Sequence, residues 1–278
     1  MFSAVIPAHN EASGIAKCLG PLSEVSQALG GEVVVVCNGC TDETAAVARR
    51  FPGVTVVETR IPSKSHALNL GDKHCTLFPR LYVDADLEIT PEDLRSLIAH
   101  LSQPDALLVA PKMRLNYSSV SRASRWYHQF WSALPAYQAR MGGLYGLSAA
   151  GRSRFDQFPD LTGDDAFVRS RFVRSEVAIP SDVSFLCDPP RTLTDLVKVR
   201  TRIVRGGREL SQAVGACPDV PTNGLSDIRA LMFRSPQCFA KGLCFLLVTL
   251  VVSARVRWQA LRGAAIGWER DNSSREPG

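Results

Sequence analysis

The chain has 278 residues, of which 45% are hydrophobic and 21% charged, and its formal net charge is +5. This composition is that of a globular protein large enough to bury a substantial core, and it excludes a fibrous or intrinsically disordered chain. The positive charge is concentrated in residues 191–278, which hold 14 basic and 7 acidic side chains. Such a segment suits an anionic lipid surface or a polyphosphate. We expect no nucleic-acid partner, because stacking aromatics are not interleaved with the basic residues.

The first residues, Met1–Pro7, lack a basic segment and reach a proline after a short apolar run, so they predict a first strand and no signal peptide. A cytoplasmic protein is therefore expected. In that setting, eight cysteines are better explained as buried small hydrophobic residues than as a disulfide framework. Cys37 and Cys40 form a single CxxC without a second pair at zinc-ligand spacing, so a structural zinc or a redox role is the less favoured interpretation.

Over the first 110 residues, short apolar runs alternate with segments of helical periodicity, which predicts a mostly parallel sheet flanked by helices. The expected strands are Phe2–Ile6, Val33–Val36, Val54–Val57, Leu81–Val83 and Ala106–Val109. The expected helices are Glu11–Leu29, Thr41–Phe51, Ser65–Cys75 and Pro91–Leu101, with Thr41 and Thr90 as N-caps. Ligands of such sheets bind beyond the carboxyl ends of the strands. The loops expected to converge there are Pro7–Glu11, Cys37–Asp42, Arg60–His66 and Asp84–Glu88.

Beyond residue 110 the alternation ends. We expect a helix over Ser118–Arg140, a flexible glycine loop over Gly142–Gly146 and a helix over Thr162–Phe172. Residues 1–190 are predicted to form one domain, in which residues 111–190 pack on the same sheet as residues 1–110. A helical, basic region, 191–270, and a disordered tail, 271–278, are expected to follow.

An uncharged apolar stretch, Gly242–Ala254, lies between Lys241 and Arg255. It is shorter than the ~20 residues that cross a bilayer, so a buried or interfacial helix is expected in place of a full span. Trp258 and the neighbouring arginines favour contact with a membrane surface over burial in a core.

Two aspartates, Asp84 and Asp86, directly follow the strand-forming run Leu81–Val83. Residues alternate faces along an extended segment, so both carboxylates can point the same way, where they repel unless a cation lies between them. Such oxygen ligands suit Mg²⁺ or Mn²⁺, whose remaining ligands are usually water and substrate phosphates. Alternatively, Asp86 begins a turn and caps the helix that starts near Pro91.

Motifs at the expected strand ends resemble those of family-2 glycosyltransferases with the GT-A fold, and the resemblance covers roughly residues 2–175. The matching segments are Val5–Glu11, Val36–Thr44, Lys64–Asn69, Asp84–Asp86 and Leu161–Phe167. The resemblance implies an α/β fold of the GT-A type, with a nucleotide-sugar-binding half over residues 1–110 and an acceptor half over residues 111–190.

In this family the loop after the first strand contacts the nucleotide, so the resemblance assigns Pro7, His9 and Glu11 to the nucleotide-sugar. Asn38 would pair with the base. Asp42 would support its loop, or simply stabilise the start of a helix as an N-terminal carboxylate.

The resemblance places Lys64 at the donor diphosphate, where its charge would add to the N–H groups of a helix start. The Asp84-Ala85-Asp86 segment matches the DxD motif, which binds Mn²⁺ or Mg²⁺ at the diphosphate. Asp86 would be the direct metal ligand, whereas Asp84 would meet the ribose or complete the metal shell through water.

Asp165 aligns with the catalytic base of the family's Thr-Glu-Asp segment, and Asp164 beside it would raise its proton affinity by like-charge repulsion. The alternative is two carboxylates in the first turn of a helix. The segment Gly142–Gly146, with Gly146 among the donor contacts, and the basic pair Arg152 and Arg154 resemble elements that border the donor and acceptor sugars.

The chain also departs from the family pattern. Cys37 stands where an acidic residue is common and Cys40 where serine is common, which weakens any inference about the base. Gly163 and Asp164 replace Thr-Glu. The Gln-x-x-Arg-Trp motif of polymerising members is missing from its nearest match, Val199–Ile203, and this favours transfer of a single sugar.

The resemblance thus implies inverting, metal-dependent transfer of one sugar from a nucleotide-sugar, a UDP-sugar being favoured, to a hydroxyl acceptor. Glycan, exopolysaccharide or glycolipid synthesis on the cytoplasmic face of a membrane is the expected setting. Two alternatives stay open: transfer onto a polyprenyl phosphate, and a catalytically silent protein that binds a nucleotide-sugar.

Overall fold

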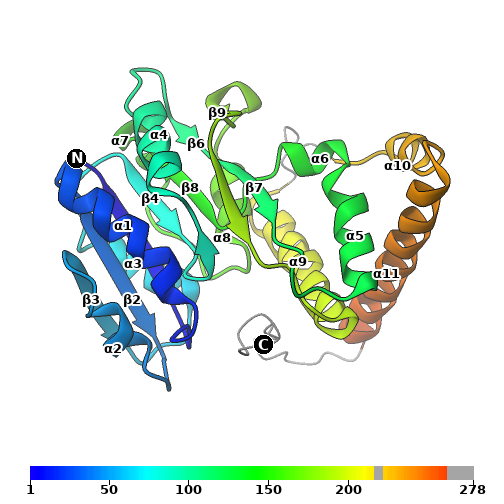
Figure 1. Cartoon of the computed structure of the whole chain (residues 1–278), viewed down its shortest axis with the longest axis horizontal. Coiled ribbons are helices and arrows are strands. Elements are labelled where there is room, and N and C mark those ends of the chain that lie inside the picture. The colour runs from blue at the N-terminus through cyan, green and yellow to red at the C-terminus, as the bar shows by residue number, and fades with distance from the viewer. Residues whose placement is uncertain (216–221, 262–278) are drawn as a thin grey trace. The chain divides into compact units, whose positions relative to one another are not determined.

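A computed structural model describes residues 1–215 and 222–261, which form two compact units (Figure 1). The first unit comprises residues 1–114 and 141–187, and the second comprises residues 115–140 and the described residues from 188 on. The segment expected to be an acceptor half, residues 111–190, is therefore divided between the two units. The expected tail, residues 271–278, lies outside the described residues.

The first unit is built on a seven-stranded sheet with the order β3-β2-β1-β4-β8-β6-β9. Its strands are β1 (Ser3–Ala8), β2 (Glu32–Asn38), β3 (Val54–Thr59), β4 (Arg80–Val83), β6 (Leu108–Val109), β8 (Leu144–Leu147) and β9 (Val177–Ala178). Strands β1 to β4 are parallel, and β8 is antiparallel to both β4 and β6. A three-stranded sheet contains β5 (Leu87–Glu88), β7 (Lys112–Leu115) and β10 (Ser184–Cys187). The prediction of a mostly parallel sheet is confirmed.

The central strands are apolar on both faces because helices cover both faces of the sheet. Helices α1 (Ile15–Leu29), α2 (Thr44–Ala48) and α4 (Pro91–Leu101) contribute to the main hydrophobic core on one side. On the other side, α3 (Lys64–Asp72) packs against β1 and β2. The shorter helices of this unit are α7 (Ala149–Arg152), α8 (Asp164–Arg169) and the 3₁₀ turn η1 (Arg174–Glu176).

Some expected boundaries shift for local reasons. Helix α4 begins as expected, with Thr90 Oγ1 accepting the Asp93 N–H. Helix α2 begins at Thr44, whose N–H donates to Asp42, so Thr41 is not its cap. The prediction of a flexible loop over Gly142–Gly146 does not hold for its second half. Leu144–Leu147 forms strand β8, which pairs with β4 on one side and β6 on the other.

The second unit is helical. It contains α5 (Arg122–Ser132), α6 (Pro135–Gln138), α9 (Leu193–Val214), α10 (Leu225–Met232) and α11 (Pro236–Leu261). Its own hydrophobic core includes Tyr127, Phe130, Leu196, Met232, Phe245, Val248, Val252 and Val256. Helix α11 contacts α5, α9 and α10, so it organises the unit.

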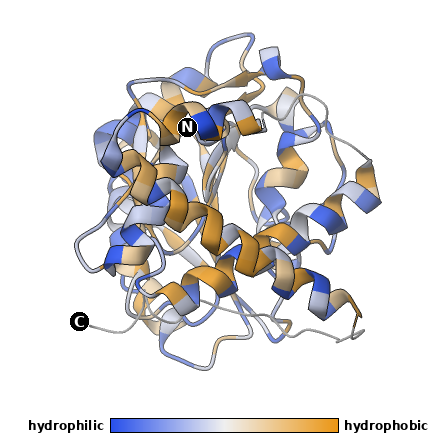
Figure 2. Ribbon diagram, turned by 90° about the vertical axis from the view of Figure 1, so that its right-hand side faces the viewer, coloured by the Kyte–Doolittle hydropathy of each residue, from blue (hydrophilic) through white to orange (hydrophobic). Residues whose placement is uncertain are grey.

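Helix α11 has 26 residues, twice the length of the apolar stretch Gly242–Ala254. By length and composition alone it is long and apolar enough to cross a membrane, and 28% of its most apolar window is buried in the structure. Figure 2 shows α11 mostly in the hydrophobic colour.

Candidate active site

The loops that follow β1 and β2 are fastened to each other by hydrogen bonds. Asn10, which has a φ of 54°, accepts the Thr41 N–H at 2.7 Å through Oδ1 and donates through Nδ2 to Thr41 Oγ1 at 3.1 Å. Asp42 accepts the N–H groups of Ala12 and Thr44. Asn10 tolerates the left-handed conformation that this turn requires. The first and second motifs therefore lie together, as the alternation of strands and helices predicts.

His9 and Asn38 extend this junction, since His9 Nδ1 hydrogen-bonds to the Asn38 carbonyl. Pro7 occupies a buried β1 position opposite Val36 and beyond the last residue that pairs with β4. Its missing N–H therefore costs no ladder bond on the β4 side. The Glu11 N–H donates to Thr44 Oγ1 at 2.8 Å.

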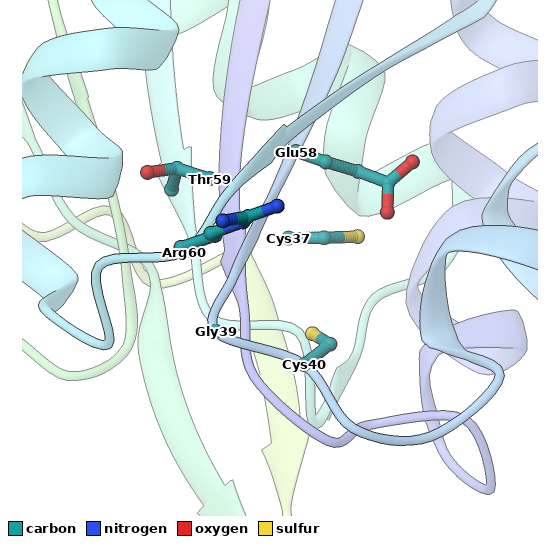
Figure 3. A pocket seen from close by; sticks show the side chains of 6 residues that line it. All are labelled: Cys37, Gly39, Cys40, Glu58, Thr59 and Arg60. Atoms are coloured by element: carbon teal, nitrogen blue, oxygen red, sulfur yellow. The ribbon is translucent and has the colours of Figure 1, made fainter.

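A pocket of about 470 Å³ opens where β2 and β3 end (Figure 3). Its walls are formed by Cys37, Gly39, Cys40, Glu58, Thr59 and Arg60. Gly39 has a φ of 65°, and its N–H donates to the Thr59 carbonyl at 2.7 Å, so the loop folds back onto β3. The carboxyl edge of the sheet thus has a recess beside Asn38.

Lys64, at the start of α3, joins two carboxylates from distant parts of the sequence. Its Nζ lies 2.5 Å from Asp84 Oδ1 and 2.7 Å from Asp164 Oδ1. The other oxygen of Asp164 accepts the Tyr145 hydroxyl at 3.0 Å. Three residues that the sequence assigned to three separate motifs therefore form one half-buried charge cluster at the ends of the strands.

The electrostatics of this cluster follow from burial and proximity. Burial raises the pKa of Asp84 to about 6, Lys64 opposes the rise, and the neighbouring carboxylates of Asp164 and Asp86 add to it. Burial alone would lower the pKa of Lys64, but Asp164 and Asp84 raise it above its ordinary value. Lys64 is therefore a fixed cation between two carboxylates.

Asp86 is exposed, and Asp165 lies beside Asp164 in the first turn of α8. That helix begins after Gly163, whose φ of 96° favours glycine. Glu11, Asp84 and Asp86 all lie near the buried thiol of Cys18, whose pKa is raised first by burial and then by these carboxylates. The first motif and the DxD segment consequently border the same region.

Gly143, which the sequence did not distinguish from its neighbours, lies against Asp84. Its carbonyl accepts the Asp84 N–H at 2.7 Å, and a Cβ atom at Gly143 would overlap Asp84 Oδ2. Gly146 instead faces the core, where a Cβ would overlap Leu101 and Leu81. Close packing alone explains this glycine, and its assignment to the donor site stays a prediction.

Arg152 and Arg154, which were expected to border the donor and acceptor sugars, instead pair with carboxylates of the first unit. Arg152 donates through Nε and Nη2 to Asp72 Oδ2, at 3.0 and 2.7 Å, and Arg154 pairs with Glu176. Asp72 further accepts from Arg80 and from the Tyr82 hydroxyl. Arg152 thus belongs to a buried ionic network that joins α3, β4 and α7, a role that no local sequence signal indicated.

The carboxylates of Asp84 and Asp86 suit a hard divalent cation whose remaining coordination positions are filled by a bound ligand. Asp86 is open to solvent, and Gly143 lacks the Cβ atom that would displace Asp84 Oδ2. Within residues 1–215 and 222–261, no group of three or more His, Cys, Asp and Glu side chains could hold a metal ion. A site with one or two carboxylates relies on water and phosphate oxygens for its remaining ligands.

Comparison with known sequences identifies the class of protein. The family described as Glycosyl transferase family 2 matches residues 3–172, and the chain belongs to this family. Over 95 residues it is 36% identical to a 4,4'-diaponeurosporenoate glycosyltransferase of Staphylococcus aureus (strain MRSA252). That match covers 32% of this chain and about a quarter, 24%, of the relative's length.

Solved structures show the same fold, which is the GT-A fold. A mannosyltransferase from Pyrobaculum calidifontis, in complex with GDP-Man and Mn²⁺, superposes with a TM-score of 0.63 at 20% identity, covering 95% of this chain and 81% of that one. A glucosyl-3-phosphoglycerate synthase from Mycobacterium tuberculosis, in complex with Mn²⁺, UDP-Glc and phosphoglyceric acid, gives 0.56 at 19% identity, covering 81% of each chain.

Proposed function

We propose that this glycosyltransferase-family protein transfers a single sugar, with inversion, from a nucleoside-diphosphate sugar to a hydroxyl acceptor. The observation that carries the proposal is the cluster of Lys64, Asp84 and Asp164 at the carboxyl edge of a GT-A sheet. Family membership and the nucleotide-sugar complexes of similar structures support it. The reaction would serve glycan, exopolysaccharide or glycolipid synthesis.

The donor would bind across the fastened loops. The recess beside Asn38 would take the base, with Pro7, His9 and Glu11 bordering the nucleoside. Asp42 would act through the loop junction, because both of its oxygens accept hydrogen bonds there. We favour a UDP-sugar.

Asp86, with Asp84 beside it, would hold Mn²⁺ or Mg²⁺ against the donor diphosphate. A divalent ion bound there supplies charge neutralisation for the departing diphosphate. Lys64 would add a positive charge from the start of α3, exchanging a carboxylate partner for a phosphate oxygen. The exposed position of Asp86 suits a ligand that is met from solvent.

Asp165 would remove the proton from the acceptor hydroxyl as that oxygen attacks the anomeric carbon on the face opposite the diphosphate. Asp164 is held on both oxygens by Lys64 and Tyr145, so it would position the start of α8 and keep the local potential negative. A carboxylate beside another retains its proton more readily, which suits a base.

The first test is donor binding. Melting curves with UDP-, GDP- and dTDP-sugars, with and without Mn²⁺, should show a shift for one donor with Mn²⁺, since a ligand at 100 times its Kd stabilises by about 2.7 kcal/mol. Asp86→Asn should abolish the Mn²⁺-dependent part of the shift, whereas Glu92→Gln, an exposed carboxylate on α4, should preserve it. If no nucleotide-sugar moves the melt, the proposal is wrong.

The variant Asp165→Asn tests whether the acceptor group is a hydroxyl or a polyprenyl phosphate. A hydroxyl acceptor needs a base, so kcat should fall by about 10²–10⁴-fold while donor binding is retained. Full activity in this variant would favour a phosphate acceptor, which needs no base. Metal-dependent hydrolysis of the donor without acceptor would exclude a catalytically silent binding protein.

We also propose that the second unit holds the protein at the cytoplasmic face of a membrane. Helix α11 buries one face against its neighbours and exposes a second apolar face, formed by Phe239, Leu243, Leu247, Leu250, Val251, Trp258 and Leu261. Arg255 and Arg257 near its end would meet anionic headgroups. An interfacial position uses both the apolar face and the basic residues.

A further inference from the structure

We propose that Cys37 and Cys40 are a thiol pair that closes reversibly to a disulfide and thereby lowers the affinity for the nucleotide donor. The effect on the donor rests on the function proposed above, whereas the formation of the disulfide does not. Both residues belong to the loop after β2, and both contribute to the recess beside Asn38 (Figure 3).

The geometry places the two cysteines at the same recess. Cys37 is the penultimate, buried residue of β2, and the chain then turns back at Gly39, whose φ is 65°. The Cys37 and Cys40 side chains flank this turn and both line the recess (Figure 3), and each thiol perturbs the pKa of the other. Both cysteines are free in this structure. Two thiols on either side of one tight turn can form a bond, provided that the loop can adopt the disulfide geometry.

The two thiols differ in their surroundings, and this difference sets the order of reaction. Cys37 is buried, whereas Cys40 is partly exposed at the recess. The hydrogen bond from Cys37 lowers the pKa of Cys40 to about 6, and the Asn10 N–H contributes to the same effect. Reactive cysteines are those that combine thiolate character with access to solvent, so Cys40 is the attacking residue and Cys37 the resolving one.

The step balances with a low-molecular-weight disulfide as the oxidant. The Cys40 thiolate attacks one sulfur atom of the disulfide, forming a mixed disulfide and releasing one thiolate, which takes up the proton that Cys40 lost. Cys37 then attacks the Cys40 sulfur and passes its own proton to the second departing thiolate. Two protein thiols are oxidised to one disulfide, and one small disulfide is reduced to two thiols.

Closure should weaken donor binding because Cys40 also fastens the loops. In the reduced form the Cys40 sulfur accepts the Asn10 N–H at 3.4 Å, and when protonated it also donates to the Ala8 carbonyl at 3.4 Å. A bond to Cys37 draws this sulfur away from both partners. The junction between the loops after β1 and β2 then loses the hydrogen bond from Asn10 and the contact with Ala8 at the edge of the recess.

The chemistry is tested on the full chain with oxidised glutathione, followed by alkylation and peptide mass spectrometry. The peptide that carries both cysteines should lose two hydrogen atoms and escape alkylation, and dithiothreitol should reverse this. Cys37→Ser should instead retain glutathione on Cys40, because the resolving thiol is missing. Cys40→Ser should leave Cys37 unmodified. Full alkylation of both thiols in the oxidised wild type would overturn the proposal.

The effect on the donor is measured by titrating the nucleotide-sugar into oxidised and reduced protein with Mn²⁺. Oxidation should lower the affinity by about tenfold or more in the wild type, equivalent to about 1.4 kcal/mol, and leave Cys40→Ser unchanged between the two conditions. Equal affinities in a wild type shown to carry the disulfide would overturn the regulatory part. If reduced protein binds no nucleotide-sugar, the proposed function fails while the mass spectrometry still decides the thiol chemistry.

Discussion

Gly143 and Gly146 lie three residues apart and have different physical reasons to be glycine. A side chain at Gly143 would collide with the Asp84 carboxylate, whereas one at Gly146 would collide with the apolar side chains of Leu101 and Leu81. The sequence shows only a glycine-rich segment, since nothing in the letters indicates which α-carbon faces the charged cluster. Pairing of β8 with β4 decides it.

We expect Gly143→Ala and Gly146→Ala to separate binding from stability. The first should displace Asp84 and weaken Mn²⁺-dependent donor binding by about tenfold or more, with a modest change in stability. The second overpacks the core and should cost about 1–3 kcal/mol of unfolding free energy while the folded fraction still binds the donor. Urea denaturation and donor titration measure the two effects. Equal loss of donor binding in both variants would contradict the distinction between the two glycines.

The stability of the second unit should depend on pH through His128. Burial lowers its pKa to about 4, against an ordinary value of 6.5, and its ring hydrogen-bonds to the Ser124 carbonyl at 2.8 Å. Between these two values the unfolded chain binds more protons than the folded chain, so stability rises with pH and is lost as pH falls.

The wild type should therefore lose about 2 kcal/mol between pH 7 and pH 5 relative to His128→Gln. Urea midpoints at the two pH values provide the measurement, and His74→Gln, at an exposed histidine of the first unit, is the matched control. A wild type and a His128 variant with parallel pH profiles would show that His128 does not stay neutral when folded.

At the scale of elements, the sequence predicted the framework of the first unit because its signals are local. Continuous valine runs define β2, and Thr90-Pro91 defines the start of α4. The ionic network around Asp72 was not predicted, since Asp72 and Arg152 are 80 residues apart and each looks like a surface residue in its own segment. Only the packing of α3 against the sheet brings α3, β4 and α7 together.

Asp72→Asn should destabilise the first unit by about 3–5 kcal/mol, because the buried guanidinium groups of Arg80 and Arg152 lose their charged partner. Glu24→Gln is the control: it breaks the pair with Arg95, in which both side chains are exposed, and should cost about 1 kcal/mol or less. Chemical denaturation of both variants compares them. A similar small cost for both would show that the Asp72 network contributes little to stability.

At the scale of the molecule, the fold of the first unit and the convergence of its loops followed from the βαβ alternation, but the division of the chain did not. Residues 115–140 read as a continuation of the same domain, yet α5 shares a core with α9 and α11. Tyr127 and Phe130 give no sign of their partners, because the residues they pack against, such as Phe245, come more than 100 positions later. The periodicity of a segment shows that it has an apolar face, but not which distant segment packs against that face.

The second apolar face of α11 leads to the last prediction. A triple variant, Leu243→Gln, Leu247→Gln and Leu250→Gln, changes only exposed positions of this helix, so the core formed by its other face should remain. Burying a leucine side chain contributes about 1.5–3 kcal/mol, so losing three partly inserted leucines should weaken binding to anionic phosphatidylglycerol vesicles by tenfold or more.

Vesicle flotation measures this binding, and Leu225→Gln, at an exposed leucine on α10, is the matched control that should still float. High salt should weaken the binding of the wild type if Arg255 and Arg257 contribute, because salt screens their attraction to the headgroups. A triple variant that floats as well as the wild type would contradict an interfacial α11. A change in oligomeric state without vesicles would instead indicate that a second copy of the chain covers this face.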